Sequence, residues 1–466
     1  MTEQQAEIQN AVTYAQEKNS LFLEGFQELL RIPSIITEPA YKNDVSRAAA
    51  WLVGEMTRIG LRNAQVLPSE GHPVAYGEWL EAGPDRPTLL VYAHYDVQPV
   101  GPIELWESPP FEPAIRDGKL FARGVIDDKA GAFLNLKALQ SILGSAGELP
   151  LNVKVFFEGE EEAGSPSMRS FISEHKALLA ADLLLVSDGG PLPDQPLCAT
   201  STRGIVAGDV VITGPKRDLH SGSFGWIVHN PTHMVGEIIA AFHDQEGRIQ
   251  IPGYYDGVRQ VSPSLLEQLK PWEPIALPSF QSKSGVAEFW GVPEYSVLER
   301  ATLQPTLDVT GVYGGYTGEG QMTIIPAMAG FNASMRIVPD QDPDDIAQKF
   351  RDFVLSFDCP TLDIRVEIVD RSRPAELLGQ GPAVEALQRA YEATWGQRAV
   401  LFRHGGSIPV LGMLHSELGI PMLDFGLGVG DNGHAPNEYM LLEHFGRGIQ
   451  RAVHLYHYLA QGLLDE

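Results

Sequence analysis

Hydrophobic residues follow two different spacings in the first two hundred positions. At 20–31, 48–59 and 129–143 they recur every three to four residues, which predicts helices. Short uninterrupted apolar runs, typical of strands buried on both faces of a sheet, stand at 88–93, 151–157 and 183–186. Strands that alternate with helices in this order indicate a mainly parallel sheet with helices on both faces.

The pattern changes near residue 204. Strands are predicted at 207–213, 330–338 and 362–369, and helices at 231–242 and 343–357. Residues 249–330 show no clear period. From 381 the first pattern returns. We therefore predict an α/β fold in which a first domain, residues 1–203 and 381–466, is interrupted by an inserted α+β domain, residues 204–380.

Composition excludes several classes of function. The chain has 466 residues, with 34 basic and 60 acidic side chains and a net charge of −26. So acidic a chain suits neither nucleic-acid phosphates nor anionic membrane surfaces, so we expect neither partner. Its two cysteines, Cys198 and Cys359, make no disulfide framework. The polar start shows no signal peptide and no apolar run could cross a membrane, so the cytoplasm is the expected location.

Four clusters of acidic or histidine residues are expected just after predicted strands. The clusters read AHYDV, GVIDDK, EGEEEAGS and VSDGG, and a fifth, NGHAPNE, lies near the C-terminus. Ligands of an open parallel sheet bind at the carboxyl ends of its strands, so we expect these loops to converge. Two histidines and several carboxylates make a mixed nitrogen and oxygen site, which suits zinc, manganese or cobalt.

Each cluster also has an ordinary structural interpretation. Residues 94–96 fit a surface turn, and the aspartates at 127–128 fit a helix cap. Asp188 before two glycines fits a plain turn, and His434 fits a packed loop. The glutamates at 160–162, however, repel one another unless a cation lies among them. Together, the clusters favour a metal site.

The number of acids favours two ions over one. A bridging carboxylate and a bridging water suit metal ions about 3.5–4 Å apart. Two adjacent glutamates can then act differently, because one can bind metal while its neighbour takes a proton from the bridging water.

Six motifs make the chain similar to a family of dinuclear-zinc exopeptidases and amidohydrolases. In order, they are AHYDV, RGVIDDKAG, EGEEEAGS, DLHSGSFG, HGGSIPV and GHAPNE. The family includes carnosinase, aminoacylase, carboxypeptidase G, acetylornithine deacetylase and succinyl-diaminopimelate desuccinylase, and the chain most resembles the carnosinase-type dipeptidases. The resemblance implies a parallel-sheet catalytic domain and an inserted lid domain that forms a homodimer.

The resemblance also implies roles for residues of the first domain. The implied metal ligands are His94, Asp127, Glu162, Asp188 and His434. Asp127 bridges two divalent ions per subunit, expected to be Zn²⁺ with Mn²⁺ or Co²⁺ as alternatives, and its bond to the next residue is often cis in the family. Asp96 orients His94, and Glu161 is the general base. Glu160 is expected to be solvated or to lie behind the ligands.

Residues of the inserted domain are implied to bind substrate. His220 resembles the lid histidine that reaches the partner subunit's site and holds the scissile carbonyl oxygen, and Asn230 is expected to assist it. Arg336 and Ser407 resemble groups that grip the substrate carboxylate, and Thr323 resembles a substrate contact. From the residues alone, DLHSGSFG also fits a capped turn, and Arg336 fits a surface strand.

The predicted function is a metallo-dipeptidase that acts on unblocked dipeptides. Asp188 supports this branch, because acylases and carboxypeptidase G tend to have glutamate there. Two departures leave the substrate open: Gly189 and Gly190 replace an aromatic residue, and His404 replaces an acid. The alternatives are an N-acyl amino-acid amidohydrolase, an inactive metal-dependent binding protein and, less favoured, a carboxypeptidase acting on long substrates.

Overall fold

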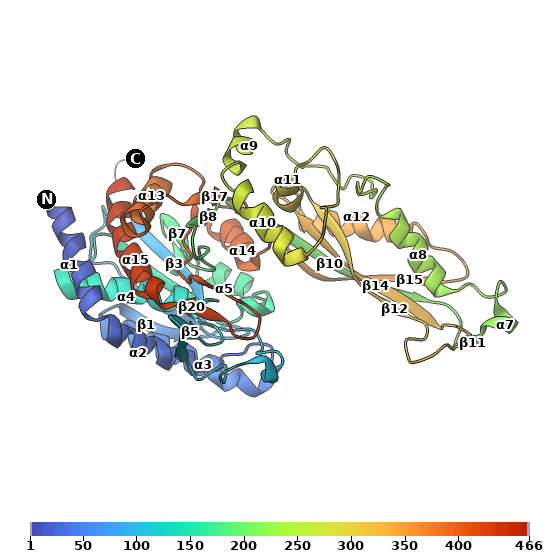
Figure 1. Ribbon diagram of the computed structural model, residues 1–466, viewed down its shortest axis with the longest axis horizontal. Coiled ribbons are helices and arrows are strands. Elements are labelled where there is room, and N and C mark those ends of the chain that lie inside the picture. The colour runs from blue at the N-terminus through green and yellow to red at the C-terminus, as the bar shows by residue number, and fades with distance from the viewer. Residues whose placement is uncertain (1, 464–466) are drawn as a thin grey trace. The chain divides into compact units, whose positions relative to one another are not determined.

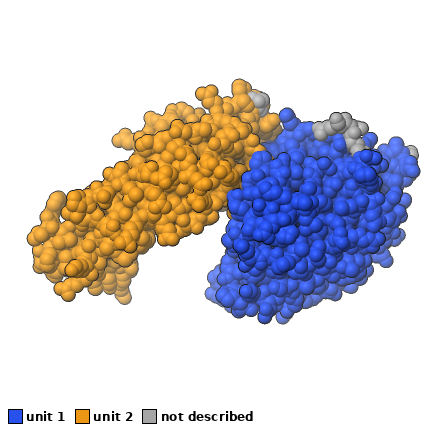
Figure 2. Space-filling model, turned by 180° about the vertical axis from the view of Figure 1, so that it is seen from behind, with its two compact units in different colours: residues 1–200, 377–402, 413–466 blue, residues 201–376, 403–412 orange. Residues whose placement is uncertain are grey.

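The computed structural model describes residues 2–463, which form two compact units (Figure 1). Unit 1 comprises residues 1–200, 377–402 and 413–466, and unit 2 comprises residues 201–376 and 403–412 (Figure 2). Residues 1 and 464–466 of the first predicted domain lie outside the described residues.

Three segments group differently from the predicted domain boundaries, and two of them are short: residues 201–203 lie in unit 2, and residues 377–380 lie in unit 1. Residues 403–412 belong to unit 2, although the sequence places them in the first domain. The cause is a set of hydrogen bonds: His404 N donates to Ser201 O at 2.8 Å, and Arg203 N donates to Gly406 O at 2.8 Å.

Unit 1 is built on a six-stranded mixed sheet. In spatial order its strands are β1 (Arg62–Leu67), β2 (Val74–Trp79), β6 (Asn152–Glu158), β3 (Thr88–His94), β7 (Leu183–Val186) and β18 (Met422–Asp424). The last four are parallel, and the first two add an antiparallel edge. Every residue of β6 and β7 is buried, as expected for strands covered on both faces. The predicted mainly parallel sheet is confirmed.

Helices cover this sheet (Figure 1). They include α1 (Glu3–Glu17), α2 (Asn19–Leu30), α3 (Lys42–Ile59), α4 (Lys129–Ala146), α13 (Pro382–Trp395) and α15 (Leu442–Gly462). The central α4 contacts α1, α15 and β3, so most of its residues are buried. Helix α3 begins six residues before the predicted start, because Val45 is the one buried residue among its first six positions and gives no period.

Unit 2 contains a four-stranded antiparallel sheet with helices packed against it (Figure 1). The strands, in spatial order, are β12 (Thr306–Gly314), β14 (Met328–Ile337), β10 (Gly204–Thr213) and β15 (Asp363–Ser372). Helices α8 (Pro231–Ala241) and α12 (Pro343–Leu355) contribute Ile238 and Phe350 to a core shared with Val210 and Phe331. The inserted α+β domain is thus seen as a unit with its own core.

The segment without a period, 249–330, is nevertheless ordered. It contains α9 (Pro263–Leu269), α10 (Glu273–Ser284), α11 (Val297–Thr302) and the edge strand β12. Helix α10 has Pro278 in its interior, and β12 is partly exposed on both faces, so neither presents a regular apolar stripe. Across residues 2–463, no helix is both long and apolar enough to span a bilayer.

A second, smaller sheet of unit 1 supports two loops of the candidate site. Its strands are β19 (Gly430–Asp431), β20 (Tyr439–Leu441), β5 (Lys119–Phe121) and β4 (Ala114–Arg116). The loop from β19 to β20 carries His434, and the turn that follows β5 leads to Asp127.

Candidate metal centre

Three predicted ligands are delivered by neighbouring parallel strands of unit 1. His94 is the last residue of β3, Glu162 lies in the short 3₁₀ helix η3 (Glu161–Ala163) after β6, and Asp188 follows β7. Because parallel strands end at the same edge of the sheet, these side chains are brought to one place.

Asp127 reaches the site by another route. The sequence places the Asp-Asp pair directly after a predicted sheet strand, and this is wrong: the pair ends a turn between β5 and α4. The Asp127–Asp128 peptide bond is cis. Asp128 caps α4, with Oδ1 accepting from Gly131 N at 3.1 Å, while Oδ2 accepts from His94 N at 3.2 Å. Sequence reasoning treated the cap and the site as alternatives, whereas Asp128 serves both.

The five predicted ligands form two overlapping groups that could each hold a metal ion. His94, Asp127 and Asp188 make one, and Asp127, Glu162 and His434 make the other. Asp127 Oδ1 lies 3.1 Å from His94 Nε2, and its Oδ2 lies 2.9 Å from His434 Nε2. His434 Nε2 is also 3.1 Å from Glu162 Oε1, and His94 Nε2 is 3.9 Å from Asp188 Oδ1. Asp127 is therefore common to both groups and faces a different histidine with each of its oxygens.

Asp96 lies behind this group, fully buried. His94 Nδ1 lies 3.1 Å from the backbone O of Asp96 and 3.3 Å from its Oδ1, so Asp96 can fix the ring while Nε2 faces the carboxylates of the predicted ligands. The two carboxylate oxygens of Asp96 also accept hydrogen bonds from Glu161 N at 3.3 Å and Glu162 N at 3.0 Å. One carboxylate thus positions both a histidine ligand and the pair of glutamates.

The three consecutive glutamates have different environments. Glu162 Oε2 accepts from Gln98 Nε2 at 2.8 Å, which leaves Oε1 facing His434. Glu161 belongs to neither of the two groups of ligand atoms found among the described residues. Of the two interpretations of Glu160, solvated or behind the ligands, the solvated one is wrong: Glu160 is 1% exposed and accepts from Ser167 N, Ser167 Oγ and His72 N.

The electrostatics match a site built for cations. Burial, with nearby Asp127 and Glu162, raises the pKa of Asp188 to about 7, against the opposing effect of His94. Burial also raises the pKa of Glu161. Bonds to Asp127 and Glu162 raise the pKa of His434 to about 10. Crowded carboxylates that resist ionisation are what a bound cation relieves, and the imidazole and carboxylate donors suit zinc, manganese or cobalt.

The glycines after Asp188 have a steric role that the sequence does not reveal. A Cβ at Gly190 would lie 1.8 Å from Gly428 O, and one at Gly426 would lie 2.4 Å from Gly189 O. The loop after Asp188 therefore packs backbone against backbone on the loop that leads to His434. An aromatic residue has no room at position 190.

The predicted substrate residues all lie in unit 2. His220 and Thr323 are exposed, and Asn230 is half-buried. Their polar contacts are mostly local: His220 Nδ1 accepts from Gly222 N at 3.1 Å, and Asn230 Oδ1 accepts from Thr232 N at 3.0 Å. The capped-turn interpretation of DLHSGSFG is therefore correct as local geometry.

Arg336 and Ser407 come together within unit 2. Arg336 Nη1 donates to Ser407 Oγ at 2.7 Å, although 71 positions separate them. Arg203, which sequence reasoning missed, donates from Nε to Gly405 O at 2.6 Å and so supports the Ser407 loop. Burial and the adjacent Arg336 lower the pKa of Arg203 to about 10. The two guanidinium groups make this an electropositive part of an acidic protein.

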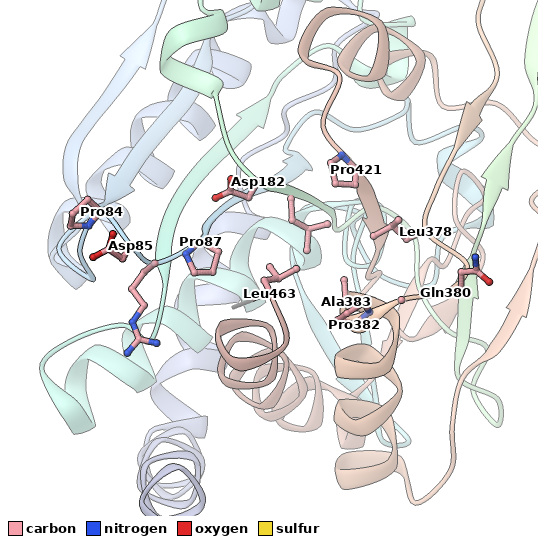
Figure 3. Close-up of a pocket in the computed structure, with 13 residues that line it drawn as sticks. Pro84, Asp85, Pro87, Asp182, Leu378, Gln380, Pro382, Ala383, Pro421 and Leu463 are labelled. Carbon is pink, nitrogen blue, oxygen red and sulfur yellow. The ribbon is translucent and has the colours of Figure 1, made fainter. Parts of the chain in front are cut away.

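A separate pocket of unit 1, about 640 Å³ in volume, lies at the other end of the strands (Figure 3). Pro87 and Asp182, which precede β3 and β7, line it together with Pro382 and Pro421. None of the predicted site residues lines this pocket, so cavity size does not identify the candidate site.

The fold and the ligand set together define a metallohydrolase-like centre on an α/β domain with an inserted unit. Residues 90–457 match the family described as Peptidase family M20/M25/M40, and the chain belongs to that family. It is 28% identical to the Cys-Gly metallodipeptidase DUG1 of Candida albicans over 95% of each chain. It is 26% identical to the Beta-Ala-His dipeptidase of Homo sapiens, over 90% of this chain and 86% of that protein. The structure of the M20 family metallo-carboxypeptidase Sso-CP2 from Sulfolobus solfataricus matches with a TM-score of 0.85 and 28% identity, over 94% of this chain and 99% of that one.

Proposed function

We propose that the protein is a metal-dependent dipeptidase that hydrolyses unblocked dipeptides with two divalent ions, Zn²⁺ being the expected metal. The observation that carries the proposal is the placement of Asp127, whose two carboxylate oxygens face His94 and His434 in different ligand groups. The names of the relatives, among them Cys-Gly and Beta-Ala-His dipeptidases, support a dipeptide as substrate.

In this proposal the two ligand groups bind the metal ions, and Glu161 transfers the proton. The two divalent ions would be held by His94, Asp127, Glu162, Asp188 and His434, and they would polarise the scissile carbonyl and lower the pKa of the attacking water. Glu161, which is outside both ligand groups, accepts the proton of that water and passes it to the leaving amine. Asp96 holds the backbone of Glu161 in place by accepting a hydrogen bond from its N–H group.

Unit 2 supplies substrate recognition in this proposal. Arg336 and Ser407 bind the C-terminal carboxylate, since a guanidinium beside a hydroxyl suits a planar anion. The protein acts as a homodimer through unit 2. His220, assisted by Asn230 and Thr323, approaches the partner subunit's site and donates to the carbonyl oxygen. The exposure of His220 supports this role, because its Nε2 edge is available to a second chain.

One other activity has support from a specific observation. The similarity to a metallo-carboxypeptidase favours release of a C-terminal residue from longer peptides, which would use the same ligands, base and carboxylate-binding arginine. An N-acyl amino-acid amidohydrolase would also use the same centre.

A hydrolysis panel distinguishes these functions. Purified protein is incubated with Zn²⁺, Mn²⁺ or Co²⁺, with and without a chelator. The substrates are unblocked dipeptides, β-alanyl dipeptides, tripeptides, an N-blocked longer peptide and N-acetyl amino acids. We expect chelator-sensitive cleavage of unblocked dipeptides. Cleavage confined to the blocked peptide would favour the carboxypeptidase, and cleavage confined to N-acetyl amino acids would favour the amidohydrolase. No cleavage with any metal would contradict all three.

A further inference from the structure

Glu438 is a fully buried carboxylate four residues after His434, in the loop from β19 to β20. Its Oε1 accepts hydrogen bonds from Ile126 N at 3.0 Å and Asp127 N at 3.3 Å. Its Oε2 accepts from Gly124 N and from Arg123 Nη1, each at 2.8 Å. Both oxygens are therefore engaged by the turn that ends at Asp127.

Arg123 extends this connection to a third loop. It is 1% exposed, and its Nη2 donates to Pro99 O at 3.0 Å, in the loop that follows His94 and Asp96. Its guanidinium also lies 5.6 Å from the centre of the Trp106 ring. One buried ion pair thus ties the loop that follows His94 to the turn that ends at Asp127 and to the loop that carries His434. Burying the Arg123–Glu438 pair costs desolvation free energy, which apolar side chains in its place would not. In some proteins such a pair fixes the geometry of the segments that it joins.

The two ligand groups depend on this pair to different extents. His94 ends a central strand, and its backbone is also held by Asp128. His434 lies in an exposed loop and has φ 63°, in the left-handed region that few non-glycine residues adopt. Glu438 joins that loop to the backbone of Asp127.

We propose that Glu438 is a positioning residue that sets Asp127 against His434, so that the group of Asp127, Glu162 and His434 holds its ion. The proposal rests on the two-metal centre proposed above. Loss of Glu438 should weaken this ion selectively, whereas the ion held by His94, Asp127 and Asp188 should keep most of its affinity.

The test is a Zn²⁺ titration of the full chain against a chromophoric chelator, which measures binding rather than turnover. We expect wild type to bind two ions and Glu438→Gln to bind one of them 10- to 100-fold more weakly, the usual effect of losing a partner behind a ligand. The matched control is Glu55→Gln, because Glu55 is also a fully buried carboxylate of unit 1, paired with Lys137 on α4. Glu55→Gln should leave both affinities within about twofold of wild type.

A second comparison identifies which ion is affected. In a His434→Ala background, adding Glu438→Gln should not weaken the remaining ion further. If Glu438→Gln does not fold, Glu438→Asp keeps the charge but shortens the reach, and it should weaken the same ion by about three- to tenfold.

The possible outcomes distinguish the positioning role of Glu438 from the two-metal function on which it rests. Two ions of unchanged affinity in Glu438→Gln and Glu438→Asp would overturn the positioning role alone. Equal weakening of both ions, or additive weakening in the His434→Ala background, would also overturn it. Fewer than two ions in wild type would contradict the two-metal function as well.

Discussion

The predicted metal ligands of unit 1 are held differently from two of the predicted substrate residues of unit 2, His220 and Asn230. In unit 1, side chains distant in sequence fix the ligands: Asp128 holds the His94 backbone, and Gln98 holds Glu162. In unit 2, His220 and Asn230 accept hydrogen bonds from backbone N–H groups two residues ahead in the same turn.

The predicted metal centre is therefore held in place by several elements of unit 1, whereas His220 and Asn230 are held only by their own turns. A hydrogen bond from another element restricts how far a ligand can move, and catalysis at a metal centre requires ligands held in a defined geometry. A bond within one turn fixes only the conformation of that turn. We therefore expect substitutions in unit 1 to affect the chemical step most. Substitutions in unit 2 should act through assembly of the partner subunit's site, as at His220, or through substrate binding, as at Arg336.

Replacement of Glu161 is expected to have the largest effect. Glu161→Gln keeps the size of the side chain but cannot accept the proton, so kcat should fall by about 10²- to 10⁴-fold. Because Glu161 is outside both ligand groups, bound metal should remain at the wild-type level. The contrasting variant is Glu162→Gln, which should lose metal. A wild-type rate in Glu161→Gln would refute its assignment as the base.

Mixed dimers test whether His220 acts across subunits. His220→Ala alone should lose about 10²- to 10³-fold in kcat, because it removes a donor to the developing oxyanion. After subunit exchange with Glu161→Gln at equal amounts, half of the dimers are mixed and each has one intact site, so activity should recover to about a quarter of wild type.

Two controls are needed for that measurement. Each variant taken alone through the same exchange procedure should stay inactive, and wild type should survive it. Activity of the mixture equal to the mean of the two parents would show that no site is shared, and unit 2 would then need another role for its exposed turn.

The same difference explains what the sequence could and could not predict. The positions of His94, Glu162 and Asp188 could be predicted from the sequence. Buried parallel strands appear in it as apolar runs, and the carboxyl ends of such strands lie at one edge of the sheet. Buried Glu160 and Glu438 could not be predicted, because a charge pattern does not say which acid is surrounded by backbone N–H groups. Partly buried Arg203 could not be predicted either, because its main partner is a backbone carbonyl about two hundred positions away. The helices between 249 and 330 were missed because Pro278 and the absence of an apolar stripe remove the helical period.

The smallest expected effect concerns the one long-range pair among the predicted substrate residues. Arg336 and Ser407 hydrogen-bond to each other across unit 2. Loss of the charged Arg336 should raise KM more than loss of the neutral Ser407. Arg336→Met removes a charged partner of the substrate carboxylate, which is worth about 1.5–3 kcal/mol, so KM should rise about 10- to 100-fold. Ser407→Ala removes a neutral partner, so KM should rise about two- to tenfold.

The control for this series is Arg365→Met, because Arg365 is an exposed strand arginine paired with Asp363 on β15. It should leave both kcat and KM near wild type. If Arg336→Met lowers kcat without raising KM, Arg336 acts in the chemical step. Unit 2 would then contain part of the prearranged machinery, and the separation between a fixed centre and a recognition unit would no longer hold.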